Sequence, residues 1–271
     1  MNKSSRRTGG YTILEVVIVL TVSSILFAAS VVGYVAQNRR TQFTESVNDF
    51  AQDIQDILND VEVGFYPSNN SFSCTTDTSH AGHPYSPGGA SQQGTNTNCI
   101  FAGKAIQFAP SRHNGTRSDI DIFTMVGRRQ KLGTDDPAVN IKDIRPALLD
   151  VLSERKSLIS GLEVSSVRTG DGTSLAGIAM VSSSSASGGV STGLNNRASL
   201  AAIRGGPDET DTTFNNGVMS YFTVSDPIAL AKNGVNICVK EGGTGGRKAV
   251  IQLAAGESQI IVNTYIDKPC P

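Results

Sequence analysis

The chain has 271 residues, enough for one substantial domain with an appendage, and it contains 28 Gly and no Trp. Its formal net charge of -1 gives no reason to expect an acidic partner such as nucleic acid. The sequence has no nucleophile elbow, phosphate-binding loop, HExxH motif or paired catalytic carboxylates, so we expect no enzyme activity.

The N-terminus joins a basic segment to a long uncharged one. Three basic residues lie among the first ten, and after Glu15 the next charged residue is Arg39. Val16–Asn38 is therefore an uncharged run of 23 residues, and a helix of about 20 residues crosses the hydrocarbon core of a bilayer. The positive-inside rule predicts that the basic leader stays in the cytoplasm and that the chain after this run lies on the far side.

An ordinary cleaved signal peptide is the alternative interpretation, because the small residues Ala28, Ala29 and Ser30 could precede a cut. Two features count against it. The uncharged run exceeds the usual apolar core of about 7 to 15 residues. In addition, Glu15 lies near the start of the run, where an unpaired carboxylate costs a few kcal/mol.

The segment from Gly10 through Tyr11 to Glu15 resembles the N-terminal signal of type IV pilins and type II secretion pseudopilins. In that family a basic leader ends in Gly, an aromatic residue follows, and Glu comes four residues later. The resemblance implies that a prepilin peptidase cuts between Gly10 and Tyr11 and methylates the new amine of Tyr11. It also implies that Glu15 faces the Tyr11 amine of a neighbouring subunit during assembly. Many members carry a Pro midway along this helix, and this chain has none between Ser23 and Val35.

The helix is expected to continue to Val63 with one apolar face. Apolar residues recur at spacings of three and four, which is typical of an amphipathic helix, and Gly64 is expected to end it. The residues of this face are Phe43, Val47, Phe50, Ile54, Ile57, Leu58 and Val61. The acidic row Asp49, Asp53, Asp56 and Asp60 is interpreted as a solvated face, with contact to a basic neighbour as the alternative.

The remainder, residues 64–271, predicts a β-rich globular domain with long loops at residues 68–99 and 169–216. Its apolar segments are short, rich in Ile, Val, Phe and Thr, and separated by turn residues, which favours antiparallel sheets. The predicted strands are Lys104–Ala109, Ile120–Val126, Leu158–Val167, Leu175–Val181, Met219–Val224, Val235–Lys240, Ala249–Leu253 and Gln259–Ile266. Pro146–Lys156 is predicted to be a short helix, and Ser182–Asn196 a surface loop.

The predicted organisation is therefore α+β. A leader covers residues 1–10, a transmembrane and polymerisation segment residues 11–36, and an amphipathic helix residues 37–63. The hydrophobic and amphipathic halves form one long helix packed on a mainly antiparallel β domain, which is the pilin fold. The order of a two-cysteine loop, the segment from Ala102 to Phe108 and a late Cys resembles the H-type minor pilins and pseudopilins.

The cysteines Cys74, Cys99, Cys238 and Cys270 are expected to form disulfides, because they are even in number and show no metal-ligand spacing. Three pairings are open. Locality and the resemblance favour Cys74 with Cys99 and Cys238 with Cys270.

The resemblance implies a structural subunit that partners other pilin subunits, a prepilin peptidase and a membrane assembly platform. It starts in the cytoplasmic membrane, with its globular domain outside the cytoplasm, and ends in a pilus or periplasmic pseudopilus. The alternative is a tip or surface pilin that binds a cell surface or DNA, the latter through the basic pair Arg247 and Lys248. No cofactor is expected. Ca²⁺ is the one candidate, by analogy with some pseudopilins, on the oxygen ligands of Asp208, Glu209 and Asp211 or Asp171.

Overall fold

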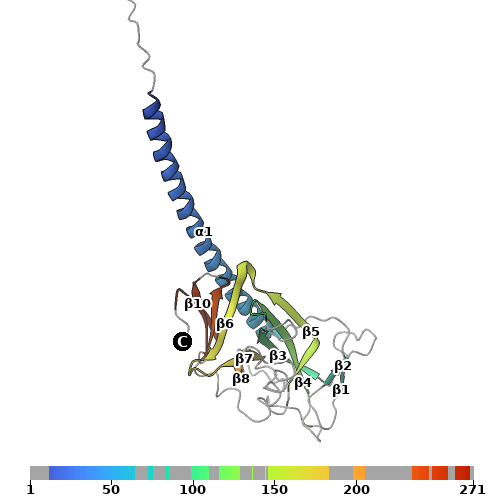
Figure 1. Ribbon diagram of the computed structural model, residues 1–271. Helices are drawn as coiled ribbons and strands as arrows, with labels where there is room; N and C mark the ends of the chain where they lie inside the picture. The colour runs from blue at the N-terminus through green and yellow to red at the C-terminus, as the bar shows by residue number, and fades with distance from the viewer. Residues whose placement is uncertain are drawn as a thin grey trace, which may run out of the picture. The chain divides into compact units, whose positions relative to one another are not determined.

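The computed structural model describes residues 12–64, 73–75, 83–85, 99–109, 116–128, 136, 144, 146–182, 198–204, 234–243, 246–255 and 260–268. In these residues a long N-terminal helix is followed by antiparallel strands, which confirms the α+β class (Figure 1). The chain divides into two units, Met1–Thr44 and Glu45–Pro271.

Helix α1 spans Ile13–Val63, close to the predicted length. It ends as expected at Gly64, whose φ of 72° is the left-handed conformation that glycine adopts most readily. The Gly64 N–H donates to the Val61 carbonyl at 3.2 Å and so satisfies one of the last carbonyls of the helix. The predicted boundary is confirmed.

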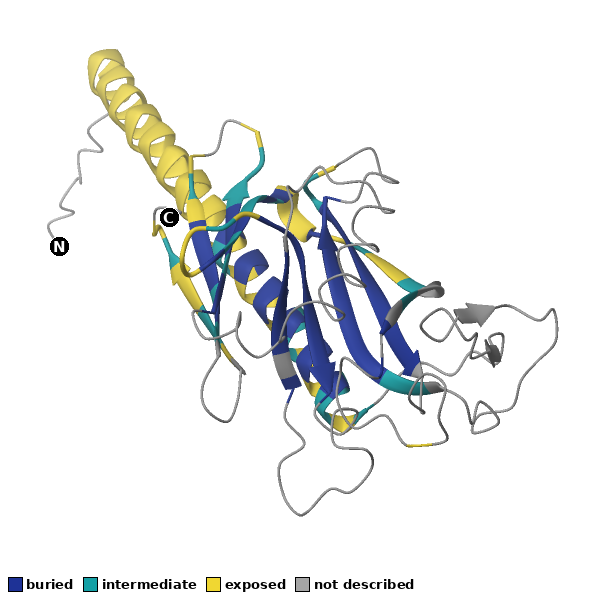
Figure 2. Cartoon of the chain, turned by 90° about the horizontal axis from the view of Figure 1, so that it is seen from below, coloured by how far each residue is buried: buried dark blue, intermediate teal, exposed yellow. Residues whose placement is uncertain are grey.

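The apolar stripe of the second half of α1 is buried as predicted. Every stripe residue from Val47 to Val61 is at most 6% exposed, and Phe43 is also buried. Figure 2 shows this buried face of the helix running alongside the β-strands of the globular unit. Burying such side chains contributes about 1.5–3 kcal/mol each, which anchors residues 45–63 on the sheets.

The larger sheet has five strands in the order β5-β4-β3-β7-β8, all antiparallel. Their bounds are β3 Cys99–Phe108, β4 Asp119–Arg128, β5 Ala147–Ser157, β7 Leu175–Ser182 and β8 Ala198–Arg204. One face carries a buried cluster that includes Ala105, Phe123 and Ala179. From the opposite face, Lys104 of β3 reaches Asp60 of α1.

A second antiparallel sheet has the order β11-β10-β9-β6. Its strands are β6 Leu162–Thr169, β9 Val235–Glu241, β10 Lys248–Ala255 and β11 Ile260–Ile266. Two three-residue strands, β1 Ser73–Thr75 and β2 His83–Tyr85, pair inside the segment predicted as the loop 68–99. Most of the predicted strands correspond to strands of the two larger sheets, with bounds shifted by a few residues.

The prediction of a helix at Pro146–Lys156 is wrong, because this segment forms β5. Residues such as Leu148 and Glu154 favour a helix locally, but antiparallel pairing with β4 overrides that preference. Arg155 and Ser157 also bond the Asp119 carboxylate, each at 2.6 Å, which fixes the strand register.

Two further segments differ from the expectation. The strand predicted from Leu158 begins only at Leu162, because a 3-10 turn at Ile159–Gly161 comes first, with positive φ at Ser160 and Gly161. The predicted long loop at residues 169–216 contains β7, which confirms the predicted strand Leu175–Val181, and it also contains β8, which was not predicted. The predicted strand Met219–Val224 and most of the predicted loop Ser182–Asn196 lie outside the described residues.

Candidate membrane-spanning and assembly segment

The first half of α1 carries large apolar side chains that are exposed to solvent. They are Ile13, Leu14, Val16, Val17, Ile18, Val19, Leu20, Val22, Ile25, Leu26, Phe27, Val31, Val32, Tyr34 and Val35. The helix contains an 18-residue window with a mean hydropathy of 2.5 that is not buried by the rest of the chain. An apolar surface of this extent is typical of a segment that contacts lipid or another protein. The helix is long and apolar enough to cross a membrane.

Three hydroxyl groups in this segment bond within the helix itself. Thr21 donates to the Ile18 carbonyl at 2.9 Å, Ser24 to the Leu20 carbonyl at 2.7 Å, and Ser30 to the Leu26 carbonyl at 2.8 Å. In lipid an unsatisfied polar group costs several kcal/mol, so such bonds make these hydroxyls compatible with a hydrocarbon environment. These intrahelical hydrogen bonds and the apolar side chains are therefore both compatible with a membrane-spanning segment.

The helix begins with a cap at Thr12. The Thr12 hydroxyl oxygen accepts the Glu15 backbone N–H at 3.3 Å, and the Thr12 carbonyl accepts the Val16 N–H at 3.2 Å. Glu15 lies in the first turn, where the helix dipole favours a carboxylate by about 0.3–1 kcal/mol. Thr12 and Glu15 have the spacing of a capping box, a signal that our sequence analysis missed.

Only one of the predicted processing and assembly residues, Glu15, lies among the described residues, which begin at residue 12. Glu15 is exposed, like the other residues of the first half of α1. Gly10 and Tyr11, where cleavage and methylation are predicted, lie outside the described residues. Their roles stay predictions.

Cys238 lies in β9, is 1% exposed and is disulfide-bonded. Cys74 lies in β1 and Cys99 begins β3, whereas Cys270 lies outside the described residues. A disulfide at Cys238 agrees with the expected use of the cysteines, and the pairing stays a prediction.

The basic pair Arg247 and Lys248 leads into β10. Lys248 is exposed, and across the strand pair it lies opposite Lys240. Lys240 forms an ion pair with Glu163 at 3.0 Å, so this local positive charge is partly neutralised. DNA binding through the pair stays a prediction.

Of the candidate Ca²⁺ ligands, the structure describes Asp171 alone, and Asp208, Glu209 and Asp211 lie outside the described residues. The Thr169 hydroxyl and the Thr173 backbone N–H donate to the Asp171 carboxylate and hold its pKa below the ordinary value. Among the described residues no group of three or more His, Cys, Asp or Glu could hold a metal ion.

Two members of the acidic row bond to the globular domain. Asp60 forms an ion pair with Lys104 at 2.6 Å, and Asp53 forms one with Lys156 of β5. These two carboxylates fasten α1 to the five-stranded sheet while their side chains stay partly exposed, so the predicted solvated face holds only in part for them. No pattern in the sequence marks the pairs, because each joins residues far apart in the chain.

Comparisons with protein families, with curated proteins and with solved structures give no match for this chain.

Proposed function

We propose that the chain is a structural subunit, a minor pilin or pseudopilin, of a type IV pilus or type II secretion pseudopilus. Its apolar half-helix holds it in the cytoplasmic membrane until assembly, with the globular domain outside the cytoplasm. The subunits then polymerise through residues 11–36. The observation that carries the proposal is one continuous helix with an exposed apolar first half and a buried stripe in its second half.

The sequence signal supports the same proposal from a different side. A basic leader, Gly10, the aromatic Tyr11 and Glu15 stand in the order that resembles a prepilin signal. The globular domain resembles the pilin fold, because its antiparallel sheets pack against the second half of α1. Its size and long inserts favour a minor subunit.

The carboxylate of Glu15 has two candidate roles that are chemically separable. A capping box would use the Glu15 side chain to satisfy backbone N–H groups of its own helix. The proposed assembly role instead uses its negative charge to pair with the Tyr11 ammonium of a neighbour, since a carboxylate in an apolar environment requires a cation or donors.

The experiment compares Glu15→Gln with Glu15→Ala in cells that express the prepilin peptidase and assembly platform. Glu15→Gln preserves capping and removes the charge, whereas Glu15→Ala removes both. If the charge is what assembly requires, both variants should lower the yield of sheared filaments about tenfold or more. The variants should remain in the membrane fraction. Wild-type yield from the Glu15→Gln variant would contradict the charge-pairing role, and failure of the wild type to assemble would contradict the proposed function.

A further inference from the structure

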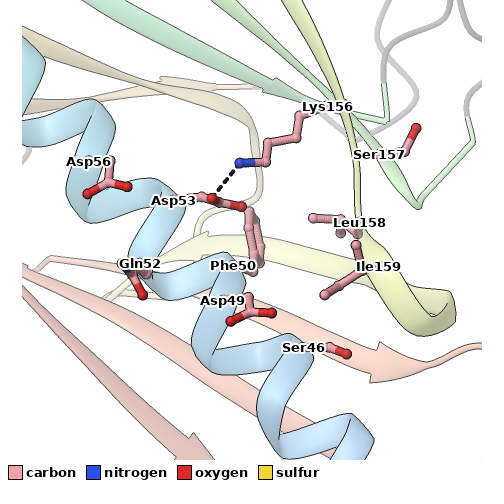
Figure 3. Close-up of a pocket in the computed structure, with 10 residues that line it drawn as sticks. All are labelled: Ser46, Asp49, Phe50, Gln52, Asp53, Asp56, Lys156, Ser157, Leu158 and Ile159. Carbon is pink, nitrogen blue, oxygen red and sulfur yellow. Dashed lines mark ion pairs between the residues drawn. The ribbon is translucent and has the colours of Figure 1, made fainter.

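A groove runs between α1 and the end of β5 in the globular unit (Figure 3). Its volume is about 320 Å³. Asp49, Asp53 and Asp56 line it from the helix, and Lys156 lines it from the strand. The floor is apolar, because Phe50 and Leu158 contribute side chains that are 2% and 8% exposed.

The charges in the groove do not balance. Asp53 forms an ion pair with Lys156, which neutralises one of the three carboxylates. Asp49 and Asp56 are exposed, and neither forms an ion pair with any residue that the structure describes. An apolar floor beneath two remaining carboxylates suits an arginine or lysine, which packs its aliphatic stem on apolar surface and keeps its charged head at the rim.

Arg39 and Arg40 are the only basic residues of α1, and both are exposed. Neither residue lines the groove, and side chains on one helix meet at spacings of three or four residues. Arg40 and Asp49 are nine residues apart, which is about 13.5 Å at the rise of an α-helix. A second copy of α1, displaced along the first, would bring the two charge groups together.

We propose that the groove receives Arg39 and Arg40 of a second copy of this chain, an inference that rests on the filament function proposed above. The neighbouring helix lies parallel to the first and is displaced along it by about 10 to 15 residues, roughly 15–22 Å. This contact between opposite charges lies outside the membrane and fixes the axial displacement of the two helices, in addition to the apolar contact of residues 11–36.

The test is a charge exchange in the full-length chain, with sheared-filament yield as the readout. Asp49→Arg with Asp56→Arg places like charges together, as does Arg39→Asp with Arg40→Asp. We expect each pair of substitutions to lower the yield about tenfold, since juxtaposed like charges cost several kcal/mol. The chain carrying all four substitutions restores the opposite charges, and its yield should return to within about threefold of wild type.

The matched control reverses two carboxylates that do not line the groove, with Glu62→Arg and Glu154→Arg. It should assemble as the wild type does, and all variants should unfold within about 3 °C of the wild type when solubilised as monomers. Four substitutions that give no recovery would overturn the inference. The inference would also be overturned if the groove reversal lowered the yield and the reversal of Arg39 and Arg40 did not, since another basic chain would then occupy the groove. If the wild type assembles and the charge variants assemble equally well, this inference is contradicted and the proposed function still stands.

Discussion

Gly103 lies at a bulge in β3 where the backbone needs a residue without a side chain. Its φ is 144°, and a Cβ there would lie 2.0 Å from the Met180 carbonyl oxygen of β7. The oxygen belongs to the backbone of a central strand and cannot move aside cheaply. The close approach of β3 and β7 therefore depends on this glycine.

We predict that Gly103→Ala lowers the free energy of unfolding by about 3 kcal/mol or more, because it adds both backbone strain and a clash. Chemical denaturation of the solubilised protein measures the change. Gly246→Ala is the control, since a Cβ at Gly246 meets nothing within 4 Å. Equal stability of the two variants would refute the packing argument.

The ion pair of Lys104 with Asp60 is unequally buried, since the side chains are 9% and 39% exposed. Asp60→Asn leaves a buried ammonium without its carboxylate, whereas Lys104→Met leaves a carboxylate that water can reach. We predict a loss of about 1–3 kcal/mol for Asp60→Asn and a smaller loss for Lys104→Met. Denaturation midpoints compare the two variants, and the reverse order would contradict the assigned burial.

The elements differ in how far local sequence determines them. The α1 helix was predictable over its whole length, because its apolar run and its stripe are both local patterns. β5 was not, because its strand state depends on pairing with β4 and on the Asp119 carboxylate. β8 was missed because its Ala-rich sequence has little β-propensity, and its pairing with β7 supplies the stability.

The first half of α1 yields a prediction at this scale. Leu26→Arg places a charge in the middle of the apolar run, where it costs about 2.5–3.5 kcal/mol on the insertion scale. We expect the variant to lose most of its carbonate-resistant membrane fraction, measured by immunoblotting. Asn48→Arg adds the same charge at an exposed position outside the run and should leave the fraction unchanged. Equal membrane retention of both variants would argue against a spanning helix.

At the scale of the whole molecule, the sequence predicted the class of fold and not its topology. The orders β5-β4-β3-β7-β8 and β11-β10-β9-β6 arise from pairings between distant segments, such as β3 with β7 and β6 with β9. The same reason applies to the site. Glu15 is part of a local motif and could be singled out, whereas the groove beside Asp49 and Asp53 exists only once β5 packs near α1.

The most direct test of the filament proposal is the intact mass and N-terminal sequence of the membrane-associated protein, with and without the prepilin peptidase. We predict a mature chain that begins at N-methylated Tyr11 when the peptidase is present and an uncut chain that begins at Met1 when it is absent. A chain that begins near Val31, or one that retains Met1 in both strains, would contradict the account.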